Sequence, residues 1–179
     1  MDEQIILEEE LIAEERAIEA ARLGAAITKR PIRKLPTLRP PVCVAPAASV
    51  RNAIDAMNEH RTGCVLVVED DNTLVGIFTE RDVLTKIACH AVDIDATAVA
   101  DAMTRDPECL TLDDGIAYAL NMMSVGGFRH IPLVDAERSP TGVVAMRDIV
   151  DYIVDMFPEA VLNLPPSPAH GIAREREGA

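Results

Sequence analysis

Catalysis needs an activated nucleophile, a paired acid and base, or a set of metal ligands, and this sequence shows none of these groupings. Ser49, Ser124 and the four cysteines stand in no recognisable activation pattern. No second histidine or cysteine stands at metal-ligand spacing from His130, and no glycine-rich phosphate loop is present. We therefore expect a protein that is not an enzyme and that carries neither a metal ion nor a resident cofactor.

Two pairs of residues could nevertheless bind a ligand. Thr79 and Asp82 follow an apolar run, and their spacing is close to that of a helix capping box, so capping and ligand contact are both open for them. Arg129 and His130 are adjacent and could donate charge-assisted hydrogen bonds to an anion. An arginine can also pair with a surface acid, and a histidine can be an ordinary strand residue. For the pair taken together we favour ligand contact.

An internal repeat positions these residues. When the sequence is shifted by 66 residues without gaps, identical residues coincide along both halves. The identical pairs are Arg39 and Arg105, Pro41 and Pro107, Cys43 and Cys109, Ala53 and Ala119, Met57 and Met123, Val68 and Val134, Gly76 and Gly142, Arg81 and Arg147, Asp82 and Asp148, and Ile87 and Ile153. A register held over this length is hard to obtain by chance, so we expect two copies of one structural unit.

Each copy predicts the element order β-α-β-β-α. A short strand is expected first, at Val42–Ala45 or Glu108–Leu112, and then a helix, for which Asp113 is the expected N-cap in the second copy. Two strands and a last helix follow, with the strands at Cys64–Glu69, Leu74–Thr79, His130–Asp135 and Thr141–Ala145. One such unit would expose an apolar sheet face. We therefore expect an α+β (mixed α/β) fold in which two units pack with pseudo-two-fold symmetry.

Charge and proline content divide the rest of the chain. Residues 1–27 are expected to form an acidic helix, residues 28–39 a basic, extended, proline-containing linker, and residues 158–179 a disordered proline-rich tail. The formal net charge of −13 opposes nucleic-acid binding. No apolar run is long enough to span a membrane, and the acidic start does not resemble a signal peptide. We expect a cytoplasmic protein whose cysteines are mostly small buried hydrophobes.

The repeated pattern resembles the CBS domain, which occurs as tandem pairs called Bateman modules. The residues that carry the resemblance are Gly76–Asp82, Gly142–Asp148, Arg129–Asp135 and Ala102–Pro107. The resemblance covers about residues 37–157, with repeat 1 at residues 37–92 and repeat 2 at residues 93–157. It implies a stand-alone regulatory protein that reversibly binds an adenosine ligand, namely AMP, ADP, ATP or S-adenosylmethionine, in a cleft between the repeats.

The family pattern also implies which residues contact the ligand. Its aspartate holds the ribose hydroxyls and its threonine or serine reaches a phosphate, which carries over to Thr79 and Asp82. In repeat 2 only Asp148 carries over, because Ala145 replaces the hydroxyl residue. The loss of this hydroxyl beside a retained aspartate favours a ribose role over pure capping.

The partner repeat is implied to complete each site. Its first strand lies against the adenine, here Asp106, Pro107 and Glu108, and its basic residues face the phosphate, here Arg129 and His130. Repeat 1 has Gly63 and Cys64 at the positions of this basic pair. We therefore expect one competent cleft, and one degenerate cleft that has Asp148 but no hydroxyl and no cation.

The resemblance therefore implies a non-enzymatic energy-sensing module, and because family members commonly dimerise, it also implies a homodimer. One alternative is a ligand-free dimeric scaffold that binds an unidentified protein partner. Another is an S-adenosylmethionine-binding module, which Arg129 disfavours because the sulfonium is positively charged.

Overall fold

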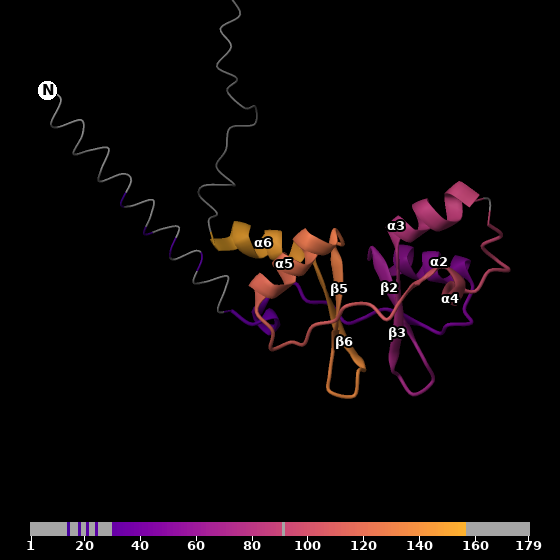
Figure 1. The fold of residues 1–179 in the computed structure, drawn as a ribbon, viewed down its shortest axis with the longest axis horizontal. Coiled ribbons are helices and arrows are strands. Elements are labelled where there is room, and N and C mark those ends of the chain that lie inside the picture. Colours follow the sequence, from indigo (N-terminus) through magenta and orange to yellow (C-terminus); the bar gives the residue numbers. More distant parts are fainter. Residues whose placement is uncertain are drawn as a thin grey trace, which may run out of the picture.

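The computed structural model describes residues 30–90 and 92–156, together with Glu14, Ile18, Ala21 and Gly24, each of which is helical. The rest of the acidic segment 1–27, and the tail from residue 157, lie outside the described residues. The acidic helix and the disordered tail therefore stay predictions. In Figure 1 the two hairpins of the described part lie side by side, and the helices flank them on the outside.

The first repeat has the predicted element order. β1 (Cys43–Val44) runs parallel to β2 (Cys64–Val68), and β2 runs antiparallel to β3 (Leu74–Thr79). Helix α2 (Val50–His60) joins β1 to β2 and begins after Ser49, whose hydroxyl accepts a hydrogen bond from the Asn52 N–H at 3.2 Å. The buried face of α2 packs on the sheet. This packing forms the core of the repeat, which includes Val50, Ala53, Met57, Val65, Val67 and Phe78.

The last helical segment of repeat 1 is irregular. It starts as one turn, α3 (Glu80–Asp82), and continues as a π-helix, η2 (Val83–Ile87), and a 3-10 turn, η3 (Ala88–His90). Ile87 is buried in the core, whereas Leu84 is exposed. π-helical turns are rare and occur frequently at functional sites.

The second repeat contains α5 (Ile116–Gly126), β5 (His130–Val134), β6 (Pro140–Ala145) and α6 (Met146–Met156). Its expected first strand is reduced to a single parallel bridge between Leu110 and Leu133. The prediction that Asp113 caps α5 is wrong, because the N-cap is Gly115 and it has no side-chain cap. Asp114 instead turns its carboxylate back to the Thr111 N–H at 2.6 Å, so the helix begins later than expected.

The 66-residue register holds in three dimensions. Asn72 and Arg138, which are equivalent residues, both have φ of 66° in the turns of the two hairpins. Glu80 N–H donates to the Gly63 carbonyl at 3.1 Å, and the equivalent Met146 N–H donates to the Arg129 carbonyl at 2.9 Å. The fold is mixed α+β, with two repeats related by approximate two-fold symmetry.

The segment before each repeat packs on the other repeat. η1 (Ile32–Lys34) precedes repeat 1, yet Ile32 and Leu35 are buried in the core of repeat 2. The expected extended linker over residues 28–39 therefore contains a 3-10 turn, because two apolar side chains three residues apart are buried together there.

The segment before repeat 2 likewise packs on repeat 1, so the two repeats exchange their leading segments. α4 (Val99–Ala102) contributes to the core of repeat 1, and β4 (Thr104–Arg105) pairs antiparallel with β3. The connection from residue 93 to residue 105 thus joins the core and, through β4, the sheet of repeat 1, although the sequence boundary assigned it to repeat 2. This exchange brings residues 104–108 to the boundary between the repeats.

The two hairpins also pack directly on each other. Cys64, Leu66, Leu74 and Ile77 form a buried cluster against Val134 and Val143 of repeat 2. Burial raises the pKa of the Cys64 thiol to about 12. Cys43 and Cys89 are exposed, so the expectation of mostly buried cysteines is wrong for these two. Within the described residues, no helix has the length and apolar character that a membrane crossing requires.

Candidate functional site

A cavity of about 340 Å³ opens between the two repeats, where β3 ends and β5 begins. Its lining residues are Gly63, Ile77, Thr79, Glu80, Arg81, Asp82, Thr104, Asp106, Pro107, Glu108, Phe128, Arg129, His130 and Pro132. The structure thus brings seven predicted ligand-binding residues to one cavity, and these are Thr79, Asp82, Asp106, Pro107, Glu108, Arg129 and His130. Asp148 lies elsewhere, along a second cavity.

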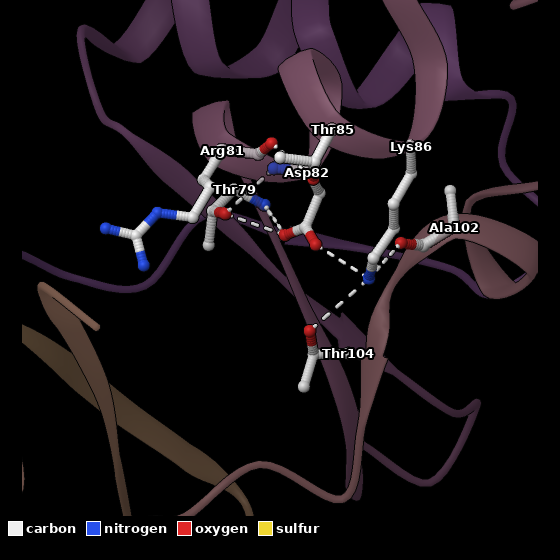
Figure 2. Close-up of polar contacts among 7 residues, drawn as sticks. All are labelled: Thr79, Arg81, Asp82, Thr85, Lys86, Ala102 and Thr104. Carbon is white, nitrogen blue, oxygen red and sulfur yellow. Dashed lines mark hydrogen bonds and ion pairs between the residues drawn. The ribbon is translucent and has the colours of Figure 1, made fainter. Parts of the chain in front are cut away.

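Thr79 and Asp82 form a capping box at the start of α3. Asp82 Oδ2 accepts hydrogen bonds from the Thr79 N–H at 2.9 Å and from the Thr79 hydroxyl at 2.6 Å (Figure 2). The Asp82 N–H lies 3.4 Å from Thr79 Oγ1. Asp82 is 7% exposed, and among the described residues it is the one charged residue that is buried. The capping role is therefore present, and it fixes the carboxylate at the cavity wall.

Lys86 provides a second partner for this carboxylate. Its Nζ lies 2.7 Å from Asp82 Oδ1, 2.8 Å from the Ala102 carbonyl oxygen and 3.5 Å from Thr104 Oγ1 (Figure 2). Lys86 thereby ties η2 to the segment that joins the two repeats. A buried carboxylate that kept no positive partner would be costly, and this ion pair supplies the partner.

The opposite wall comes from the segment that joins the repeats. Asp106 has φ of 44°, which is unusual for a residue other than glycine. Its N–H donates to the Val75 carbonyl at 3.1 Å, and its carboxylate pairs with Arg138 from the β5–β6 turn. These contacts from both repeats hold Asp106 and the following Pro107 in place. The apolar part of the lining consists of Ile77, Pro107, Phe128 and Pro132.

A partition of four residues separates this cavity from a second one. Gly63, Glu80, Arg129 and His130 line both cavities. A Cβ placed on Gly63 would come within 2.8 Å of His130 Cε1, so glycine here lets the imidazole pack closely. Burial lowers the pKa of His130, although Glu80 and Asp148 oppose this shift. His130 is therefore mainly neutral at pH 7, and the positive charge of the partition belongs to Arg129.

Arg81 makes a direct hydrogen bond between the repeats. Its Nη1 donates to the Gly127 carbonyl oxygen at 2.6 Å. Gly127 is the C-cap of α5 and has φ of 68°, a conformation that glycine adopts easily. Arg81 is exposed, but it also closes one side of the cavity.

The second cavity has a volume of about 740 Å³ and contains more positive charge than expected. Arg39, Arg61 and Arg147 line it, together with Arg129 of the partition. The prediction of a cleft with no cation is therefore wrong. The equivalence of Gly63 and Cys64 with the basic pair was correct, but arginines come from other positions. Arg39 lies before β1, Arg61 ends α2, and Arg147 lies in the first turn of α6.

Asp148 retains half of the capping interaction. Its Oδ2 accepts a hydrogen bond from the Ala145 N–H at 2.8 Å, as Asp82 does from Thr79. Asp148 therefore still contributes to capping α6, which explains structurally why repeat 2 retains this aspartate although Ala145 has no hydroxyl. The lysine position is not retained either, because the equivalent of Lys86 is Tyr152, whose hydroxyl accepts a hydrogen bond from Arg30 at 2.7 Å.

Several residues that line the first cavity, or that contact its lining residues, were not found from the sequence. Phe128 precedes the basic pair directly, so its position just before β5 was an available signal. Lys86 stands four residues after Asp82, which is ion-pair spacing on a helix, and this spacing was a weaker signal. The Arg138 contact joins two distant turns and had no local signal. In the described residues no group of three or more His, Cys, Asp or Glu side chains could hold a metal ion.

A comparison with protein families and curated proteins gives consistent matches. The family described as CBS domain matches twice, at residues 32–89 and 99–155. An uncharacterized 17.7 kDa protein of Acidianus ambivalens is 34% identical over 113 residues, which is 63% of this chain and 67% of that protein. The inosine-5′-monophosphate dehydrogenase of Methanocaldococcus jannaschii is 32% identical over 109 residues, which is 61% of this chain but 21% of that enzyme.

Other curated relatives are also much longer than the matched part. The meiotically up-regulated gene 70 protein of Schizosaccharomyces pombe is matched over 19% of its length. Among solved structures, the CBS-domain containing protein ATU1752 from Agrobacterium tumefaciens has a TM-score of 0.62 and 27% identity, with 69% of this chain and 98% of that chain covered. The CBS domain pair of protein MJ0100, crystallised with 5′-methylthioadenosine and S-adenosyl-L-methionine, has a TM-score of 0.63 and 22% identity, with coverages of 69% and 99%.

Proposed function

The chain belongs to the CBS-domain family as a tandem pair, and from this membership we propose that it is a non-enzymatic regulatory module that reversibly binds an adenosine nucleotide. The proposed site is the cavity between the repeats that Thr79, Asp82 and Arg129 line. AMP, ADP and ATP all fit this proposal.

The observation that carries the proposal is the gathering of diol-binding, phosphate-binding and apolar groups around one cavity. A fixed carboxylate, Asp82, can accept hydrogen bonds from ribose hydroxyls, and an arginine can donate charge-assisted bonds to a phosphate. Ile77, Phe128 and Pro132 add apolar surface suited to a purine ring. The volume of about 340 Å³ lies at the lower end of the roughly 300–1,000 Å³ common for small-molecule sites.

The lining also supports a regulatory mechanism. Asp82 belongs to repeat 1 and Arg129 to repeat 2, so a ligand that contacts both would bridge the repeats. Such a ligand changes the relative packing of the two repeats only if it binds one packing arrangement more tightly than another. The Arg81–Gly127 hydrogen bond crosses the same boundary and would respond to that shift.

The second cavity is proposed to be the poorer nucleotide site. It has Asp148 and several arginines, but Ala145 offers no hydroxyl to a phosphate. The proposal is therefore one competent adenosine site per chain.

A homodimer is part of the proposal. Large apolar side chains are exposed on the helices, and these include Leu84, Tyr118, Val125 and Val150. Exposed apolar side chains on helices that already cover their own sheets are suited to packing against a second copy. The same surface would serve the competing function, a scaffold that binds a protein partner without any small ligand.

A thermal-shift series with AMP, ADP, ATP, GTP and S-adenosylmethionine tests the proposal. A ligand at 100 times its dissociation constant adds about 2.7 kcal/mol of stability, which corresponds to roughly 5–10 °C for a chain of this size. We expect a shift with at least one adenosine nucleotide and a smaller one with S-adenosylmethionine, because Arg129 repels a sulfonium. No shift with any of these ligands would favour the scaffold.

A further inference from the structure

The Asp82 carboxylate has few acceptor positions left for a ligand. A carboxylate offers about four lone-pair positions, two on each oxygen. Oδ2 already accepts from both the N–H and the hydroxyl of Thr79, at 2.9 and 2.6 Å. Oδ1 accepts from Lys86 Nζ at 2.7 Å. One position, on Oδ1, remains for the two hydroxyls of a ribose.

The surroundings of Lys86 favour retention of its ion pair with Asp82 when a ligand binds. An ammonium group has three hydrogens, and Lys86 has three acceptors: Asp82 Oδ1, the Ala102 carbonyl at 2.8 Å and Thr104 Oγ1 at 3.5 Å (Figure 2). The pair with Asp82 is largely buried on the aspartate side, where the side chain is 10% exposed. A ligand hydroxyl therefore does not displace this ion pair without leaving a charge unpaired.

The Thr79 hydroxyl is the partner that can be released. A hydroxyl has one hydrogen, and this hydrogen is now directed to Asp82 Oδ2. If a ligand phosphate accepts that hydrogen, the bond to Oδ2 is lost and a second acceptor position opens on Asp82. A ligand without a phosphate leaves the bond in place.

We propose that Lys86 and Thr79 make the site selective for nucleotides over nucleosides, because they leave Asp82 able to accept one ribose hydroxyl until a phosphate engages Thr79. This inference rests on the proposed function. Lys86 acts here as a positioning and specificity-determining residue. With adenosine, either ribose hydroxyl can take the one free position, so the other contributes little. With AMP, both hydroxyls are accepted and each contributes.

The second repeat lacks both restrictions. Ala145 has no hydroxyl, and Tyr152 replaces the lysine, so Asp148 accepts only the Ala145 N–H at 2.8 Å among the side-chain and backbone contacts of the described residues. The restriction is thus a property of the first cavity and does not follow from the repeated fold itself.

The test is a calorimetric comparison of four ligands: AMP, 2′-deoxy-AMP, adenosine and 2′-deoxyadenosine, with displacement titrations for the weak binders. Loss of a hydrogen bond to a charged group typically costs about tenfold or more in affinity. We expect removal of the 2′-hydroxyl to weaken AMP by about tenfold, but adenosine by less than about twofold. Equal effects on the two ligands would overturn the inference.

Lys86→Met separates this role from general stabilisation. It opens a second acceptor position on Oδ1, so adenosine should become as sensitive as AMP to removal of the 2′-hydroxyl. A merely structural role would weaken all four ligands by the same factor and leave the difference in sensitivity unchanged, which would also overturn the inference. Lys34→Met is the matched control, since Lys34 is exposed and does not line the cavity. If the wild type binds none of the four ligands, the proposed selectivity fails. Titration with ADP and ATP then decides whether the proposed function fails with it.

Discussion

Gly76→Ala tests the exchange of segments that builds the site. A Cβ at residue 76 would overlap Met103 Sδ and lie 2.9 Å from Met103 Cγ and 3.0 Å from its Cε. Met103 is 8% exposed and packs in the core of repeat 1, although it comes from the segment that leads into repeat 2. Its N–H also donates to the Val99 carbonyl at 2.8 Å, which holds the backbone of Met103 in place. The Met103 side chain must therefore change its conformation within the core to make room for the Cβ.

The repeat supplies a matched control for this substitution. Gly142 is equivalent to Gly76, but a Cβ there would lie 3.4 Å from the Arg39 carbonyl oxygen and 3.5 Å from Leu133 Cδ1. Overpacking a filled core typically costs about 1–3 kcal/mol. At about 2–4 °C per kcal/mol for a chain of this size, Gly76→Ala should lower Tm by roughly 2–12 °C. Gly142→Ala should change Tm by less than about 2 °C.

Urea denaturation at 25 °C, followed by circular dichroism, measures the free energy of unfolding for both variants. Because Met103 precedes Thr104, which lines the cavity, the first variant should also weaken ligand binding. Equal stabilities for Gly76→Ala and Gly142→Ala would refute the packing of Met103 on β3. It would then follow that the segment of residues 99–105 does not belong to the core of repeat 1.

Two further predictions concern titratable groups. Burial lowers the pKa of His130 in the folded state, so the unfolded chain takes up the proton first and stability should fall as the pH drops below the ordinary value near 6.5; urea denaturation at pH 7.5 and 5.5 should show a smaller loss for His130→Gln, and an equal loss would contradict the assignment. The Cys64 thiol, buried and with its pKa raised to about 12, should react with a thiol reagent only after unfolding, whereas the exposed Cys43 and Cys89 should react in the folded protein. Rapid modification of Cys64, detected by peptide mass spectrometry, would contradict its burial.

The repeat made most of the fold predictable. The shift by 66 residues aligns the hairpins, and each turn then has the same backbone geometry at Asn72 and Arg138. The helix start in repeat 2 was harder to predict, because Asp113 and Asp114 are both suitable caps and neither of them caps α5. Asp114 instead accepts a hydrogen bond from the Thr111 N–H in a local turn. Aspartate side chains often bind nearby backbone groups in this way, and such bonds compete with helix capping.

The crossing segments were not predictable from local patterns. Ile32 and Leu35 stand among basic residues and prolines, so composition indicated a linker there. They are buried because the chain passes over repeat 2 before it enters repeat 1, and only the three-dimensional arrangement shows this path. The same path carries Arg39 to the second cavity, which explains part of the error about the charge of that cavity.

The candidate site was predictable where its residues belong to the repeated pattern. Asp82 was found because both copies keep an aspartate there, and Thr79 and Arg129 were found because the two copies differ at those positions. The structure places all three on one cavity. Lys86 was missed because a lysine on a helix usually lies on the surface, and nothing local indicated that Ala102 and Thr104 would lie beside it.

We expect each chain to have one adenosine nucleotide site, at Asp82. Isothermal titration calorimetry with AMP, ADP and ATP on the wild type, Asp82→Ala and Asp148→Ala measures the number of sites and their dependence on each carboxylate. Asp148→Ala is the matched control, because it removes the equivalent carboxylate and the equivalent contact with a backbone N–H. The expected result is one site per chain for at least one of these nucleotides, lost in Asp82→Ala and retained in Asp148→Ala. Two equal sites per chain, or unchanged binding by Asp82→Ala, would contradict it.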